Sequence, residues 1–173
     1  MEKIRIKNYA DIYVADYPFH KELKEEIVPL LEKYPDQPNI NSNVKATHTE
    51  WDWGRDIASV KKFRKYILNE VPIPISRGGA TYSLYCRDFW GNIYRKNDYT
   101  DDHNHSPYYM SFVYFLKATW YNSSLVFTHY GQKIRPREGK YVIFPSHLQH
   151  HVPKHRFRKS RITLSGNLNF KES

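Results

Sequence analysis

The 173-residue sequence contains a single cysteine, Cys86, which excludes an internal disulfide and a zinc site built from several thiolates. This cysteine usage is typical of proteins in reducing compartments, so we expect a cytoplasmic location. Cys86 stands in the strand-like stretch TYSLYCRDF, where a lone cysteine is usually a small buried apolar residue rather than a nucleophile.

Long apolar runs are also absent. The stretch MEKIRIKNYADIYVADYPF lacks the apolar core of a secretory signal peptide, and no run approaches the ~18 apolar residues of a membrane span. The sequence also lacks internal repeats and low-complexity tracts. We therefore expect a soluble protein with no membrane partner.

Basic residues are in excess, with 27 Lys and Arg against 18 Asp and Glu and a net charge of +9. This balance is compatible with an anionic partner such as nucleic acid. Two basic clusters stand out, KKFRK at 61–65 and KHRFRKSR at 154–161. The first is typical of a solvated lysine-rich surface, whereas the second contains an arginine at an informative distance from a histidine.

The N-terminal half predicts two helices in a chain whose length suits one domain. Apolar residues recur at helical spacing over 17–35 and again over 56–71. Pro29 lies inside the first pattern and predicts a kink or a break. Residues 3–15 alternate as in an opening strand, and the polar segment 36–53 predicts a loop.

From residue 79 onward the sequence is typical of β-structure. Short segments of β-branched and aromatic residues alternate with turn signals, and no helical pattern separates them. The segments are ATYSLYCRDFW, YYMSFVYFLKA, SLVFTHYG, KYVIFP and SRITLSGNLNF. This order predicts a mainly β protein, an antiparallel sandwich or barrel covered on one sheet by the N-terminal helices.

Two groups of histidines show a metal-ligand pattern. His103 and His105 precede an aromatic strand, and residues two apart in an extended segment point to the same face. A second group, His147, His150 and His151, lies one sandwich traverse downstream in FPSHLQHHVP. Three facial ligands leave coordination positions open, which suits non-haem Fe(II) better than structural zinc. Surface histidines without function are the alternative interpretation.

The other four histidines lack such a pattern. His20, His48 and His155 stand in polar or helical contexts, which predict solvated side chains. His129 ends a predicted strand and is placed to line a cleft. We therefore leave these four residues out of the predicted site.

Arg161 begins the strand RITLSGN, eleven residues after His150. In an antiparallel hairpin, this spacing returns the guanidinium to the depth of the histidine that precedes the turn. A buried arginine at that position needs an anionic partner, and its planar fork matches a carboxylate bidentately.

The ordered set of His103-x-His105, GKYVIFPSHLQHHV and Arg161-x-Thr163 resembles the double-stranded β-helix oxygenases that depend on Fe(II) and 2-oxoglutarate. More narrowly, it is similar to a branch found in bacteria and phages. In that branch W-x-N, here residues 90–92, precedes an H-x-H-P-like segment, and FPSWLxHxV follows it.

The resemblance covers about residues 80–170 and implies a fold and an activity. The implied fold is a jelly-roll or cupin-like double-stranded β-helix over 79–173, supported by a helical region over 1–78 within one oxygenase domain of 1–173. The implied activity couples oxidative decarboxylation of 2-oxoglutarate by O2 to hydroxylation of an unactivated C–H bond. A prolyl residue in a peptide or protein is one candidate substrate, and small molecules such as free amino acids, other protein side chains and modified bases stay open.

The resemblance also implies roles for individual residues. His103 and His150 take the places of the two metal histidines. Arg161 takes the place of the residue that pairs with the distal carboxylate of 2-oxoglutarate, and Thr163 adds a hydroxyl. His105 stands where most of the superfamily has Asp or Glu. An imidazole there leaves the iron site more positive by one charge, so His105 either completes a three-histidine site or only lines it.

Two further assignments depend on strand register. The FPSxLxHxV stretch aligns with His150, which favours His150 over His151 as the distal ligand. Asn92 and Tyr85 are placed to reach the co-substrate from a neighbouring strand. About half of five aromatic residues should face the pocket, because strand residues alternate. They are Tyr108, Tyr109, Phe112, Tyr114 and Phe127.

Two other functions stay open. A non-catalytic cupin-like metal or ligand binder keeps the histidines but has no use for Arg161 at the base of a pocket. A basic nucleic-acid-binding sandwich uses residues 154–161 to track phosphates but leaves the ordered histidines unexplained. We therefore predict an oxygenase and do not favour nucleic acid as its partner.

Overall fold

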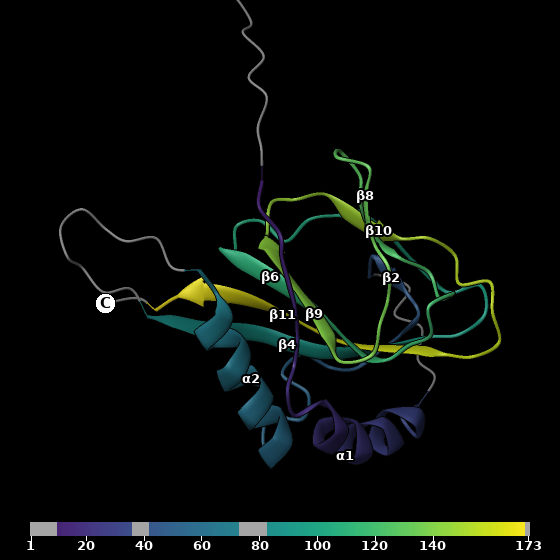
Figure 1. The fold of residues 1–173 in the computed structure, drawn as a ribbon, viewed down its shortest axis with the longest axis horizontal. Helices are drawn as coiled ribbons and strands as arrows, with labels where there is room; N and C mark the ends of the chain where they lie inside the picture. The colour runs from purple at the N-terminus through teal and green to yellow at the C-terminus, as the bar shows by residue number, and fades with distance from the viewer. Residues whose placement is uncertain (1–9, 36–41, 73–82, 172–173) are drawn as a thin grey trace, which may run out of the picture.

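The computed structural model describes residues 10–35, 42–72 and 83–171. Within them, two antiparallel sheets lie face to face, and helices cover the outer face of the larger sheet (Figure 1). The predicted opening strand falls largely outside the described residues. The predicted boundary between residues 78 and 79 also lies outside them.

Both sheets are antiparallel throughout. The larger sheet has the order β1 (Tyr13–Asp16), β9 (Lys140–Pro145), β6 (Met110–Lys117), β11 (Arg161–Phe170), β4 (Leu84–Tyr94) and β3 (Thr47–His48). The smaller sheet has the order β2 (Val44–Lys45), β5 (Tyr99–His103), β10 (His150–Val152), β7 (Leu125–Phe127) and β8 (Gln132–Ile134). Successive strands from β4 onward mostly alternate between the two sheets, so the predicted sandwich is confirmed.

Five short strands escape the sequence prediction. The strands β2 and β3 fall inside the segment that was expected to be a loop, and β5, β8 and β10 lie outside the five segments that were predicted as strands. The β5 sequence YTDDH shows the reason, since both aspartates are exposed and the strand presents little apolar surface. Strands of this kind carry no hydrophobic alternation for a sequence pattern to reveal.

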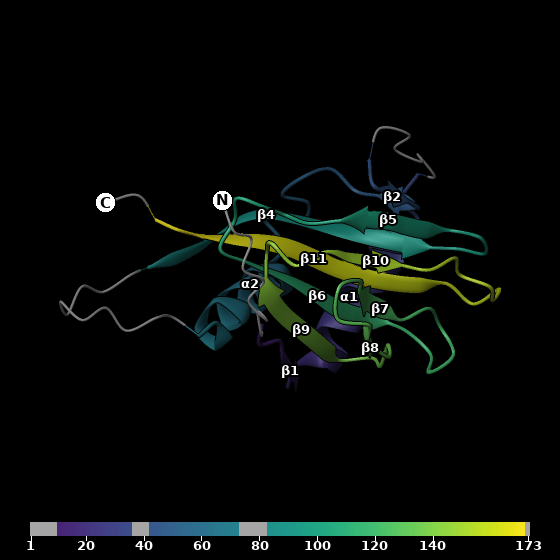
Figure 2. The ribbon, with the colours of Figure 1, turned by 90° about the horizontal axis from the view of Figure 1, so that it is seen from above.

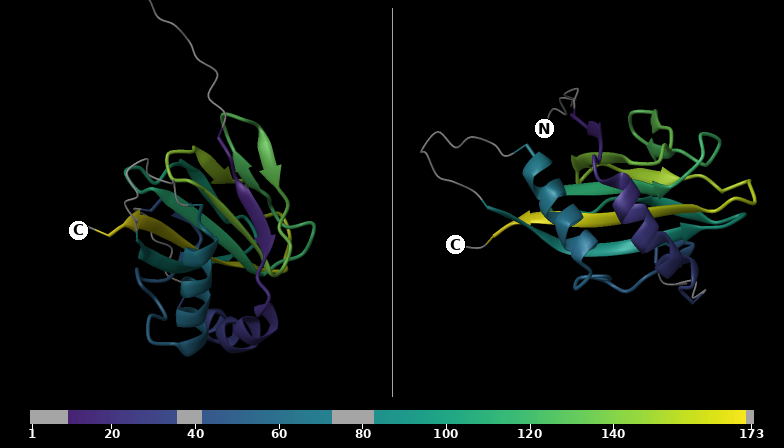
Figure 3. Two further views of the ribbon diagram at one scale, coloured as in Figure 1. Left: turned by 60° about the vertical axis from the view of Figure 1, so that its left-hand side comes forward. Right: turned by 60° about the horizontal axis from the view of Figure 1, so that its bottom comes forward.

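The two predicted helices are present as α1 (His20–Glu32) and α2 (Ala58–Glu70). Figure 3 shows both on the same side of the larger sheet. The α1 helix continues past Pro29, whose side chain is exposed, so the predicted break does not occur. Neither helix is long and apolar enough to span a membrane, and the same holds for the rest of the described chain.

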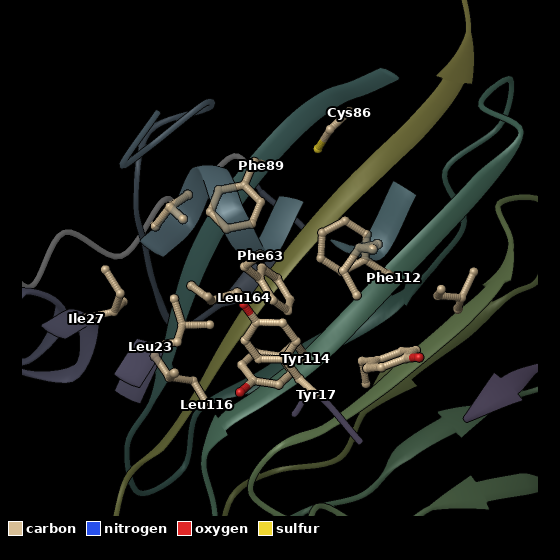
Figure 4. Packing of buried hydrophobic residues seen from close by; sticks show 14 of the residues in the cluster. Tyr17, Leu23, Ile27, Phe63, Cys86, Phe89, Phe112, Tyr114, Leu116 and Leu164 are labelled. Carbon is tan, nitrogen blue, oxygen red and sulfur yellow. The ribbon is translucent and has the colours of Figure 1, made fainter. Parts of the chain in front are cut away.

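The helices and the outer face of the larger sheet enclose an apolar cluster, which we call the helix-side core (Figure 4). Leu23, Ile27 and Leu31 of α1 and Phe63 of α2 are at most 1% exposed there. Gly91 of β4 permits this packing, because an added Cβ would lie 2.8 Å from a Leu31 methyl group. Cys86 also belongs to this core, and burial raises the pKa of its thiol to about 11, which fits the expected inert residue.

The inner face of the larger sheet is different in character. Residues 161–168 of β11 are all buried, and they alternate in chemistry. Apolar side chains face the helix-side core, namely Ile162, Leu164 and Leu168. Polar side chains occupy the intervening positions, namely Arg161, Thr163, Ser165 and Asn167. The space between the two sheets (Figure 2) therefore contains a row of buried polar groups beside β11.

Candidate metal centre

Three histidines that are remote in the sequence converge between the sheets. His103 ends β5 and lies opposite His150 of β10 in the antiparallel register, and His105 follows two residues after β5. One ligand nitrogen from each residue lies within 4.8 Å of those of the other two. The ring centroids are 4.4–5.1 Å apart. This spacing allows all three imidazoles to reach one ion.

Hydrogen bonds orient two of these rings. Nδ1 of His103 lies 2.8 Å from the carbonyl of Asp101, and Nδ1 of His150 lies 2.9 Å from the carbonyl of Leu148. A carbonyl accepts only from a protonated nitrogen, so these contacts assign the proton to Nδ1 and leave Nε2 with its lone pair. Histidines that bind a metal usually donate their other ring nitrogen to a carbonyl or carboxylate in this way.

The electrostatic environment keeps the three imidazoles neutral. Burial, together with the neighbouring His150 and His103, lowers the pKa of His105 to about 2. Burial also lowers the pKa of His150 to about 4 and shifts the pKa of His103 downward. Because a metal binds the neutral ring, all three residues are in the ligand form at neutral pH.

The nearby carboxylates point elsewhere. Asp102 accepts a 2.5 Å hydrogen bond from Thr128 Oγ1, and the Asp101 carboxylate lies 3.9 Å from Lys45 Nζ. In the described residues, the three histidines form the only cluster of His, Cys, Asp and Glu that is compact enough for a metal ion. The third candidate ligand is therefore the imidazole of His105 rather than a carboxylate.

The structure separates His150 from His151. The side chain of His150 is buried at 4% exposure and faces His103, whereas His151 projects to the opposite face and contacts Thr128 Oγ1 at 2.9 Å. The period-two alternation of a strand produces this separation. The geometry thus agrees with the register argument for His150.

The histidines open into a pocket that extends to Arg161. Arg161 lies opposite Tyr94 in the β11–β4 register, and Ser165 lies opposite Trp90, whose ring centroid is 5.9 Å from that of His105. Arg161 and Ser165 are four residue steps apart along β11, which corresponds to about 13 Å between their Cα atoms. The pocket therefore has imidazoles at one end and a guanidinium toward the other.

Arg161 is a buried cation to which the described residues offer no anionic partner. The residue is 1% exposed, and its guanidinium carbon lies 4.3 Å from the centroid of the Tyr94 ring. Its Nη1 donates to the carbonyl of Ser123, while Nε has no hydrogen-bond partner in the described structure. Burial lowers the pKa of Arg161, which reflects the cost of keeping this charge away from water. An anion in the pocket would offset that cost.

Polar side chains lie between the two ends of the pocket. Asn92 Nδ2 lies 3.4 Å from both Thr163 Oγ1 and Ser165 Oγ, and Asn92 Oδ1 lacks a partner among the described groups. Ser165 was not singled out from the sequence, although the alternation in RITLSGN places it on the same face as Arg161 and Thr163. These groups offer donors and acceptors to a ligand that spans the pocket.

Tyr85 is the predicted site residue that the structure places elsewhere. It pairs with Asn169 and does not line the pocket. Tyr85 lies five residues before Trp90 on β4, which corresponds to about 16 Å along the strand. A β-bulge opposite Asn167 and Leu168 also shifts the register between them. The expected contact of Tyr85 with a co-substrate therefore has no support in the structure.

About half of the five aromatic residues were expected to face the pocket, but only Phe112 borders it, and the Phe112 ring packs on Phe63 in the helix-side core. Tyr114 lies in the helix-side core, and Phe127 packs on the ring of Phe144. Tyr108 and Tyr109 line a separate surface groove. Phe112 and Tyr114 are two residues apart on β6, so strand alternation turns both rings toward the helices.

The remaining histidines are partly as expected. His129 is exposed, while His20 is half-buried against Tyr114 and His48 stacks on Trp90. The prediction of a solvated His155 is wrong, because this side chain is 0% exposed. Its backbone bonds to Asp98 and Asn97, which ties the segment to the β4–β5 turn and draws the ring inward.

No family model matches the sequence, and no curated protein matches it. Solved structures do match. A prolyl-4-hydroxylase from Pseudomonas putida is 16% identical, with a TM-score of 0.64 over 94% of each chain. The viral collagen prolyl hydroxylase of Paramecium bursaria Chlorella virus-1, in its 2-oxoglutarate complex, is 13% identical, with a TM-score of 0.62 over 91% of this chain and 94% of that one.

A third match is the prolyl hydroxylase of Trichoplax adhaerens, solved with a peptide of the hypoxia inducible factor oxygen degradation domain. It is 13% identical, with a TM-score of 0.66 over 92% of this chain and 82% of that one. These likenesses show the fold. The protein has the double-stranded β-helix of the prolyl hydroxylases, as the sequence resemblance predicts.

Proposed function

We propose that this protein is an Fe(II)- and 2-oxoglutarate-dependent dioxygenase that hydroxylates an unactivated C–H bond. The observation that carries the proposal is the combination, in one pocket, of three neutral imidazoles and a buried guanidinium that has no anionic partner among the described residues. A metal ion and a dicarboxylic acid complement these two features together.

The donor set fits a divalent iron. His103, His105 and His150 would hold the ion, and three protein ligands leave positions open for a co-substrate and O2. When bound, iron with 2-oxoglutarate and O2 supplies the oxidising power for hydroxylation. Because His105 replaces the usual carboxylate, the site has no protein charge to balance the metal, which favours anionic co-substrates.

The polar side chains beyond the histidines are chemically suited to 2-oxoglutarate. Arg161 would pair with the carboxylate remote from the metal, and this pairing would satisfy its free Nε donor. Thr163 and Asn92 would add hydrogen bonds along the chain of the co-substrate. Arg161 also argues against a non-catalytic cupin-like binder, because such a protein would have no use for a buried cation at this depth.

A prolyl residue in a peptide or protein is the substrate that we propose. The support is the fold, which is shared with prolyl hydroxylases, one of them solved with a peptide. A small-molecule substrate is the alternative. We further propose that the chain acts as one domain, because the helices pack on the sheet that carries Arg161, and that it acts in the cytoplasm, in line with its single cysteine.

Turnover of 2-oxoglutarate tests this function. The protein would be incubated with Fe(II), O2 and a set of proline-containing peptides, and succinate formation and peptide mass would be measured. We expect succinate formation to rise with a matching peptide, which gains one oxygen atom. His150→Ala should abolish both signals, and His151→Ala, on the opposite face of the same strand, should retain them. Equal activity of the two variants would contradict the assignment.

A further inference from the structure

Two loops meet at the end of the sandwich where β11 begins. Residues 118–124 connect β6 to β7, and residues 153–160 connect β10 to β11 (Figure 2). Ser123 Oγ donates a 3.1 Å hydrogen bond to the carbonyl of Lys154, so the loops contact each other. We call them the loop pair.

The loop pair exposes aromatic rings to solvent. Trp120 is 78% exposed and Phe157 is 43% exposed. Tyr121 bridges them, with ring centroids 5.6 Å from Trp120 and 4.7 Å from Phe157. Because water solvates such rings poorly, a connected group of exposed aromatics marks a binding surface more often than an ordinary surface.

The loop pair is also strongly basic. Its four exposed cations are Lys154, Arg156, Arg158 and Lys159, and neither loop contains an acidic residue. None of these cations forms an ion pair with any acidic residue that the structure describes. Within the described chain, the loop pair therefore carries an excess of positive charge.

The other basic cluster, at 61–65, is a useful contrast. Lys61 lies 3.5 Å from Asp56, Lys62 lies 3.0 Å from Glu22, and Arg64 lies 2.7 Å from Asp52. There the charges are balanced locally, as on an ordinary solvated helix face. The loop pair has a similar density of cations without the acids.

We propose that the loop pair binds single-stranded nucleic acid. Phosphates would contact the four cations, and unpaired bases would stack on Trp120 and Phe157, since every base offers a π face. An acidic peptide would neutralise the cations but leave the exposed rings without a partner. A bilayer needs a continuous apolar face, whereas here the planes of Trp120 and Tyr121 meet at 82° and only Trp120 is largely exposed.

This surface is separate from the metal centre. Arg161 Nη1 donates to the carbonyl of Ser123, which anchors the first loop, but the loop pair contains none of the three clustered histidines. Nucleic-acid binding should therefore survive His103→Ala, whatever that change does to oxygenase activity. The two proposals can fail separately.

Fluorescence anisotropy with labelled single-stranded DNA and RNA of mixed sequence, titrated with the full chain at several salt concentrations, tests the proposal. We expect affinity to fall steeply with salt, since bound phosphates release counterions. Arg156→Ala with Arg158→Ala should weaken binding about tenfold or more. Trp120→Ala should weaken it about fivefold or more through lost stacking. The matched control, Lys61→Ala with Lys65→Ala, removes the same charge and should change affinity less than about threefold.

Three results would overturn the proposal. The first is the absence of binding at low salt, and the second is an equal loss in the control and loop-pair variants. The third is binding to vesicles with anionic lipids, or to poly-glutamate, that is tighter than binding to the oligonucleotides. Circular dichroism of each variant would confirm that it is folded.

Discussion

Two faces of one strand, β11, can be compared residue by residue. Ile162 and Leu164 point toward the helices and are fully buried among apolar side chains, whereas Arg161, Thr163 and Ser165 point between the sheets and line the pocket. The first face stabilises the sheet by excluding water. The second buries polar groups whose hydrogen-bonding capacity is only partly satisfied. Substitutions on the helix-side face of β11 should therefore lower stability, and substitutions on the pocket face should lower ligand affinity.

The largest effect is expected on the helix-side face. Leu164→Ala removes a side chain that is 0% exposed and leaves a cavity, so the free energy of unfolding should fall by about 2–5 kcal/mol. The metal affinity of the folded protein should hardly change. Urea denaturation and metal titration would check this, and a loss of stability below about 1 kcal/mol would contradict the packing.

On the pocket face, a substitution should lower ligand affinity more than it lowers stability. Arg161→Met removes a buried cation that pairs with no acidic residue in the described part of the chain, so stability should be unchanged or higher. The affinity for 2-oxoglutarate should fall about tenfold to a hundredfold, because a charge-assisted bidentate pair is lost. Scanning calorimetry measures the stability, and titration calorimetry of the metal-loaded protein measures the affinity for 2-oxoglutarate.

Arg161→Lys sharpens the test. A lysine keeps the charge but has no planar fork, and it should restore only part of the affinity for 2-oxoglutarate. Full affinity in the lysine variant would move the carboxylate contact to another residue.

Gly91→Ala tests how closely α1 approaches the larger sheet. The added methyl group would lie 2.8 Å from a Leu31 side-chain atom, which should cost about 1–3 kcal/mol of stability. Thermal unfolding measures this change. A variant as stable as the unaltered protein would show that α1 can move aside, and the packing in Figure 4 would then be looser than described.

The smallest effect is expected at the centre of the pocket face. Thr163→Ala removes one hydroxyl beside Asn92, so affinity for 2-oxoglutarate should fall only about twofold to tenfold. Leu164→Ala, its neighbour on the other face, serves as the control. A larger effect from Leu164→Ala on this affinity would show that the two faces are not independent.

The sequence predicts those features that repeat along the chain or obey strand alternation. The helices, the long strands and the shared face of His103 and His105 follow from periodicity. The choice of His150 follows from register, and the geometry agrees with it. The short polar strand β5 carried no such signal, and neither did the burial of His155, which depends on backbone bonds to the β4–β5 turn. The prediction that Tyr85 reaches the co-substrate was wrong, because its place on a neighbouring strand does not reveal how far along that strand it lies from the histidines.

The most direct test of the account is an anaerobic titration of the protein with Fe(II) and 2-oxoglutarate, followed by absorption spectroscopy. The unaltered protein and His151→Ala should develop a metal-to-ligand charge-transfer band at one iron per chain. His103→Ala and His150→Ala should not, and His105→Ala should lose iron affinity if the imidazole is the third ligand. A full band in His103→Ala, or none in the unaltered protein, would contradict the convergence of three histidines on one metal ion.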